Sequence, residues 1–166
     1  MFHAGDLTGS REEQQNNVLS QLQALIEGER STAANLANAS ALLHFFLKDI
    51  NWVGFYLFDG AELVLGPFQG LPACIRIPLG KGVCGTSAEQ RKTLRIEDVH
   101  DFPGHIACDA ASNSEIVVPI VKEGQLLGVL DIDSPLKGRF DELDQAFLER
   151  FVGLLTDKLE LPLSLF

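Results

Sequence analysis

The chain has 166 residues, of which 46% are hydrophobic and 22% charged, and its formal net charge at neutral pH is −10. This length suits a single domain with a sizeable core, and the acidic balance argues against nucleic acid and anionic membrane as partners. No apolar run approaches the ~20 residues that cross a bilayer, and the N-terminus lacks the basic and apolar regions of a secretory signal.

Hydrophobic periodicity predicts two helices at the N-terminal end, over residues 12–28 and 30–48, where apolar side chains recur at helical spacing. The period then changes. NWVGFYLF at 51–58 ends in the turn pair Asp59-Gly60 and is followed by ELVLGPF, which together predict a β-hairpin. Shorter alternating stretches at 73–78 and 93–98 predict two further strands.

A second hairpin is predicted from residues 115–121 and 125–133, joined by the three-residue loop Lys122-Glu123-Gly124. From Asp141 onward apolar residues return to helical spacing, which predicts a closing helix capped by Asp141. The order of elements predicts an α+β fold, an antiparallel sheet with helices on one face and a ligand pocket on the other. We expect one domain over residues 1–166, with residues 1–11 as a loosely ordered extension.

Residues 80–85, GKGVCG, match the dinucleotide-binding pattern G-x-G-x-x-G and follow a predicted strand. The next strand begins by Thr93, which leaves room for less than two helical turns, and hairpins follow where a Rossmann fold needs parallel βα units. The glycines are better explained by tight backbone turns around Cys84.

The chain has three cysteines, Cys74, Cys84 and Cys108. An odd number without a signal sequence indicates a reducing compartment, so we expect a cytoplasmic protein. None lies within an apolar run, although free cysteine is often a buried, inert residue. Cys84 lies at a possible helix N-terminus, where the helix dipole lowers a thiol pKa. Spacings of ten and twenty-four residues do not fit a structural zinc site, and we expect no metal.

Three carboxylates are predicted to share one face of the second hairpin. Asp131 and Asp133 interrupt an apolar strand two residues apart, and a three-residue turn pairs Val121 with Gln125, which places Glu115 opposite Asp131. A solvated outer face is the ordinary explanation, but apolar residues share this parity. Clustered like charges raise carboxyl pKa values, so one acid can remain protonated.

The only Trp and the only Tyr, Trp52 and Tyr56, share one face of the first predicted strand, with Gly54 between them. From periodicity alone, a core strand is the favoured explanation of this pattern. Beside an acidic patch, however, an aromatic wall suits a small cationic or zwitterionic ligand with an apolar tip.

Six segments make the sequence resemble the free methionine-(R)-sulfoxide reductases, which are stand-alone GAF-domain enzymes. They are ANLANASALL, INWVGFYL, LVLGPFQG, ACIRIPLGKGVCGT, IEDVHDFPGHIACDAASNSEIVVP and GVLDIDSP, and the resemblance runs from about residue 30 to about residue 158. GAF domains in general share only the fold and mostly sense small ligands. The three cysteines in these contexts mark the enzyme branch.

The resemblance implies that Cys108 attacks the sulfur of free methionine sulfoxide, giving methionine and a cysteine sulfenic acid. Cys84 or Cys74 then forms a disulfide, which thioredoxin reduces with electrons that come indirectly from NADPH. The resemblance implies no bound cofactor. It also implies that the protein is a homodimer. Residues of matching position contact the substrate: Glu115, Asp131 and Asp133 at the oxygen, Trp52 and Tyr56 at the methyl end.

The rival hypothesis is a GAF sensor that binds an amino acid or a redox signal without turnover. Such sensors usually accompany an output domain such as a kinase, cyclase or DNA-binding module. No segment of this sequence reads as one, which favours the enzyme.

Overall fold

The computed structural model describes residues 8–106, 109–160 and 163. Its six strands form one antiparallel sheet in the order β3-β2-β1-β6-β5-β4. The strands are β1 (Trp52–Phe58), β2 (Glu62–Gly70), β3 (Arg76–Pro78), β4 (Leu94–Ile96), β5 (Ser114–Lys122) and β6 (Gln125–Ser134). The helices are α1 (Arg11–Ile26), α2 (Thr32–Phe46), α3 (Gly82–Gln90) and α4 (Glu142–Lys158), with a short 3-10 turn at Val99–Asp101.

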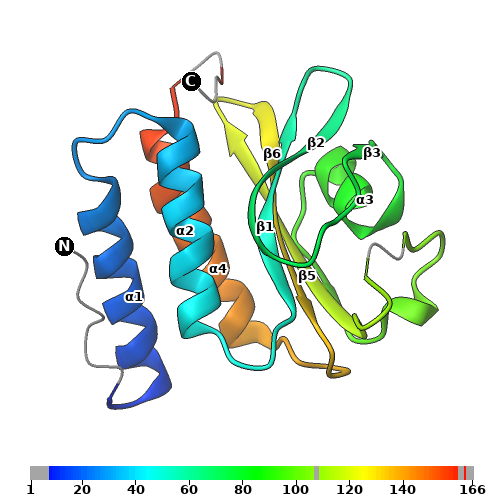
Figure 1. Ribbon diagram of the computed structural model, residues 1–166, viewed down its shortest axis with the longest axis horizontal. Helices are drawn as coiled ribbons and strands as arrows, with labels where there is room; N and C mark the ends of the chain where they lie inside the picture. The colour runs from blue at the N-terminus through cyan, green and yellow to red at the C-terminus, as the bar shows by residue number, and fades with distance from the viewer. Residues whose placement is uncertain (1–7, 107–108, 161–162, 164–166) are drawn as a thin grey trace.

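Two layers of helix and loop sandwich the sheet. Figure 1 shows α1, α2 and α4 on one side of the sheet and α3 with the long loops on the other. The predicted α+β fold, with helices from both ends of the chain on one face, is therefore confirmed. Each face has its own hydrophobic core, so β1, β5 and β6 are buried on both sides.

The first turns of α1 and α4 are fixed by the same few side chains. Ser10 and Asp141 each form a capping box, at the start of α1 and of α4, as predicted for Asp141. Arg11 binds Asp141 and Asp144, each at 2.7 Å, and so joins the first turns of the two helices. The division into one domain with an extension over residues 1–11 stays a prediction, because residues 1–7 lie outside the described residues.

The register predicted for the second hairpin is wrong by two residues. The turn contains only Glu123 and Gly124, whose φ angles of 51° and 75° suit a tight type I′ turn, so that Lys122 pairs with Gln125. A bulge next to Val121 adds a second one-residue shift. The two shifts sum to an even number, so the predicted face of each side chain is retained although the predicted partners are not.

The strands β3 and β4 each contain three residues, fewer than the predicted strands over 73–78 and 93–98. β3 begins only at Arg76, and Ile75, within the stretch 73–78 predicted as a strand, is 69% exposed. Ile77 is buried. The segment before β3 crosses the pocket side of the sheet as a loop, which places Cys74 beside the candidate site.

Among the described residues, no helix is both long and apolar enough to span a bilayer.

Candidate functional site

The three predicted acids meet on the α3 side of the sheet. Glu115 on β5 pairs directly with Asp133 on β6, and Asp131 lies diagonally across, opposite Val117. Glu115 is 5% exposed and Asp131 is 6% exposed, so neither belongs to a solvated outer face. The solvated-face alternative is thereby excluded for these two carboxyls.

Cys84 faces the acids from the first turn of α3. Its Sγ lies 3.8 Å from Oε1 of Glu115, and both side chains are buried. Gly85 allows this approach, because a Cβ there would come within 2.3 Å of the carbonyl oxygen of Pro78. The glycine-rich segment therefore packs the Cys84 thiol closely against the sheet. This agrees with the prediction that these glycines serve tight backbone turns around Cys84.

Burial dominates the electrostatics of this cluster. It raises the pKa of Glu115 well above its usual range, and the carboxyls of Asp131 and Asp133 add to the effect. Burial also raises the pKa of Asp131 to about 6, opposed by hydrogen bonds from Glu115 and Cys84. The raised pKa favours the protonated form of Glu115, which can donate a hydrogen bond or a proton.

The expectation of a lowered thiol pKa at Cys84 is wrong. Burial, followed by the charges of Asp131 and Glu115, raises the pKa of this thiol well above its usual value. A helix N-terminus contributes only about 0.3–1 kcal/mol to an exposed charge. Removing a thiolate from water beside carboxyls costs more, so Cys84 is held as a neutral thiol.

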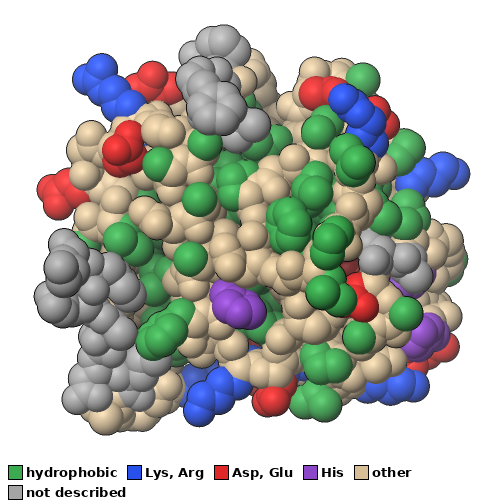
Figure 2. Space-filling view, viewed as in Figure 1, with side chains coloured by type: hydrophobic (Ala, Val, Ile, Leu, Met, Phe, Trp, Pro, Cys, Tyr) green, Lys and Arg blue, Asp and Glu red, His purple; other side chains and the backbone are tan. Residues whose placement is uncertain are grey.

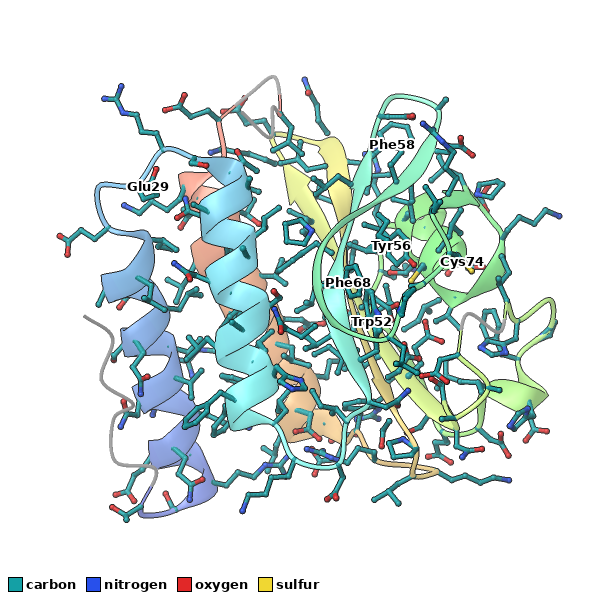
Figure 3. All side chains as sticks on the ribbon, viewed as in Figure 1. Glu29, Trp52, Tyr56, Phe58, Phe68 and Cys74 are labelled. Atoms are coloured by element: carbon teal, nitrogen blue, oxygen red, sulfur yellow. The ribbon has the colours of Figure 1, made fainter. Side chains whose placement is uncertain are left out.

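Three aromatic rings form the wall of the site on β1 and β2. Trp52 stacks with Phe68, at a centroid distance of 5.2 Å, and with Tyr56, at 5.9 Å. Figure 3 labels these three residues close to one another on the sheet. Gly54 is opposite Phe68, and a Cβ there would lie 2.3 Å from that residue's Cβ. Trp52 and Phe68 fill the space that a side chain at Gly54 would need. Phe68 was missed because its pairing with Gly54 depends on register.

The same rings hold the segment that carries Cys74. Trp52 donates a hydrogen bond from Nε1 to the carbonyl oxygen of Leu71, at 3.1 Å. Tyr56 donates from its hydroxyl to the carbonyl oxygen of Cys74, at 2.9 Å. Cys74 is disulfide-bonded, whereas Cys84 is a free thiol. The predicted nucleophile, Cys108, lies outside the described residues.

His105, Asp109 and Ser112, from the loop between the 3-10 turn and β5, line the site. Asn51 donates from Nδ2 to Oδ2 of Asp109 at 2.9 Å and to Oγ of Ser112 at 3.1 Å, which ties this loop to the start of β1. His105 lies with Nε2 3.9 Å from Oε2 of Glu115, and burial lowers its pKa. No periodicity predicts these contacts, because they join loop residues far apart in sequence.

A pocket lies between α3, the loop and the sheet, lined by the three acids, Cys84 and Tyr56, with Lys81, His105 and Ile106 among the other residues around it. A small acidic surface is visible among hydrophobic side chains on the right half of the face in Figure 2. The fold and pocket define a small-molecule-binding domain in which buried acids and a thiol converge beside an aromatic wall.

Comparison with known proteins gives the family. The GAF domain model matches residues 23–160. Free methionine-R-sulfoxide reductase of Escherichia coli is 60% identical over 132 residues, with 80% of each chain covered, and that of Saccharomyces cerevisiae is 44% identical, with 92% of each covered. The structure of free methionine-R-sulfoxide reductase from Neisseria meningitidis in complex with its substrate is 42% identical, covers 95% of each chain and superposes with a TM-score of 0.89. The chain belongs to the GAF domain family, in its free methionine-R-sulfoxide reductase group.

Proposed function

We propose that this protein reduces free L-methionine-(R)-sulfoxide to methionine. The observation that carries the proposal is the pair of buried groups at the base of the pocket: the Glu115 carboxyl, whose pKa burial raises, and the Cys84 thiol, 3.8 Å apart. A sulfoxide oxygen is a strong hydrogen-bond acceptor, and reduction requires that it receive protons as the S–O bond breaks. A buried acid that stays protonated is suited to that role.

In the proposed reaction the sulfur of Cys108 attacks the substrate sulfur while Glu115 hydrogen-bonds the oxygen. Oxygen passes to the cysteine, methionine leaves, and Cys108 becomes a sulfenic acid. The thiol of Cys74 then attacks this sulfenic acid, which releases water and forms a disulfide. The disulfide state of Cys74 and the burial of the free Cys84 support Cys74 as the partner in this step.

Cys84 then has a different role from the one first considered for it. Its raised pKa makes it a poor nucleophile at rest, but its neutral thiol can donate a hydrogen bond beside Glu115. We propose that Cys84 helps to orient the sulfoxide oxygen. Asp131 and Asp133 keep Glu115 protonated through their proximity.

The aromatic wall would receive the substrate's methyl end, with Trp52 and Tyr56 nearest the acids. The space between the acids, α3 and the loop is about 30 Å³, which suits the sulfoxide group rather than a whole amino acid. The amino and carboxyl groups would then lie toward the rim, near Lys81 and His105. A peptide chain on either group would collide with the rim, so peptide-bound methionine sulfoxide should be a poor substrate.

Thioredoxin is the proposed reductant of the disulfide, and NADPH supplies its electrons indirectly. The protein itself would need no bound cofactor. We also propose a cytoplasmic homodimer, which sedimentation equilibrium of the purified protein would test.

The activity is tested with racemic free methionine sulfoxide at millimolar concentration, thioredoxin, thioredoxin reductase and NADPH. NADPH loss that stops after half of the racemate is consumed supports the proposal. No NADPH loss above background, together with binding of the sulfoxide in calorimetry, would instead favour the sensor hypothesis.

A further inference from the structure

Cys84, Glu115 and Asp131 have the geometry of a metal site. One ligand atom from each lies within 4.8 Å of the others, and all three side chains are buried. In a tetrahedral zinc site, Zn–S of about 2.3 Å and Zn–O of about 2.0 Å place sulfur and oxygen roughly 3.5 Å apart. The measured distance between Sγ of Cys84 and Oε1 of Glu115 is 3.8 Å. A shift of a few tenths of an ångström would bring this pair of atoms to the distance that zinc requires.

An independent observation points to a missing ligand here. Oδ1 of Asp131 is buried and has no hydrogen-bond partner among the described residues, and the whole side chain is 6% exposed. Buried carboxylate oxygens without a partner are costly and uncommon. Within the described part of the chain, the nearest basic group to this cluster is His105, 3.9 Å from Glu115, and Lys81 lines the same pocket. Neither forms an ion pair with Asp131 in the described residues.

The donor set and the space select the type of ion. A thiol with two carboxylates suits zinc and its neighbours in the transition series, whereas magnesium and calcium prefer oxygen ligands alone. The cavity of about 30 Å³ exceeds the roughly 10–15 Å³ that a cavity needs to hold one water molecule, so the site has room for a small ligand such as an ion.

We propose that Cys84, Glu115 and Asp131 bind a thiophilic divalent cation such as Zn²⁺, and that the bound ion inhibits the enzyme. The ion occupies the position of the sulfoxide oxygen, ties up both proposed donors and leaves a fourth position for water. Binding of the metal stands on the geometry alone. Inhibition rests on the proposed function, since it requires a turnover to inhibit.

Cobalt(II) is the probe, because a cobalt–thiolate bond gives an intense near-ultraviolet charge-transfer absorption that oxygen ligands do not give. The protein is reduced with a phosphine, which does not itself present a thiol, and titrated with Co²⁺. The wild type should show this absorption saturating at one equivalent, and Zn²⁺ should abolish it by displacement.

Cys84→Ser should remove the absorption, whereas Cys74→Ser, which removes a thiol outside the cluster, should retain it. Glu115→Gln should weaken Co²⁺ binding about tenfold or more while retaining the band, because one charged ligand is lost and the thiolate stays. Absence of the band in the wild type, or its survival in Cys84→Ser, would overturn the proposed site.

Zn²⁺ should also inhibit sulfoxide reduction in proportion to occupancy, and a chelator should restore the rate. Stoichiometric binding without inhibition of an active enzyme would overturn the regulatory part. Binding to a wild-type protein that never reduces the sulfoxide would leave the metal site intact and refute the proposed function instead.

Discussion

Tyr56 connects the aromatic wall to the Cys74 segment, and this connection gives the sharpest prediction. Its ring stacks on Trp52, while its hydroxyl donates the 2.9 Å hydrogen bond to the carbonyl oxygen of Cys74. Burial keeps the pKa of this phenol far above its usual value, so the hydroxyl is always a donor. Tyr56→Phe preserves the ring against the substrate and removes only the bond to the Cys74 segment.

A hydrogen bond of this kind contributes about 0.5–1.5 kcal/mol net, which corresponds to a roughly 2- to 13-fold change in the population of the anchored segment. We therefore expect disulfide formation to slow by about that factor in Tyr56→Phe. The oxygen-transfer step, which does not involve Cys74, should stay within about twofold of the wild-type rate constant.

Rapid-quench measurement separates the two steps. Methionine released in the first turnover reports oxygen transfer, and trapping of the sulfenic acid with dimedone reports how long it persists before the disulfide forms. Tyr56→Phe should accumulate more trapped sulfenic acid at an unchanged methionine burst. Thr156→Val is the matched control, because it removes a buried hydroxyl whose bond to Val152 lies in α4, away from the pocket. A slower methionine burst with unchanged trapping would refute the positioning role.

Three further predictions follow from the site. Cys108→Ser should abolish turnover. Cys74→Ser should still release one methionine per chain in a single turnover and then stop. If both variants lose that first methionine equally, Cys74 takes part in the oxygen-transfer step. The raised pKa values of Glu115 and Asp131 mean that the folded protein binds more protons than the unfolded chain, so the free energy of unfolding should fall as pH rises from about 4.5 through the folded-state pKa values. The fall should be at most about 1.4 kcal/mol per pH unit for each group. In urea titrations at pH 5 and pH 8, Glu115→Gln should flatten this dependence. Gly128→Ala should destabilise the sheet by about 2 kcal/mol or more, because its Cβ would lie 2.2 Å from a backbone oxygen of β1; an unchanged urea midpoint would show that the strands separate without cost.

Side-chain periodicity was sufficient to predict the layers of the fold. The spacing of two acids along an apolar strand placed Asp131 and Asp133 on one face, and that placement depends only on the pleat. The closing helix and its cap at Asp141 were local features of the same kind. These predictions succeeded because each rests on interactions between residues close in sequence.

The predictions that were wrong or missed depend on contacts between residues far apart in sequence. The bulge beside Val121 leaves no mark in the alternation of β5, so the partner of Glu115 could not be counted from the turn. The pKa of Cys84 is set by carboxyls from β5 and β6, while sequence reasoning had only its own helix to consider. The contacts of Asn51 and Phe68 likewise depend on elements that meet only in three dimensions.

The hairpin of β5 and β6 restricts how this part of the chain can change in length. With the two-residue turn alone, Glu115 would lie opposite Ile132, and a carboxyl would have to share a face with a core residue of the helix side. The bulge restores the pairing with Asp133. A single residue inserted or deleted at the turn or at the bulge would therefore shift the register by one residue and separate Glu115 from Asp133. Only a change at the turn that is compensated by a change at the bulge would keep the acids together. Related sequences should therefore differ in length at both of these points or at neither.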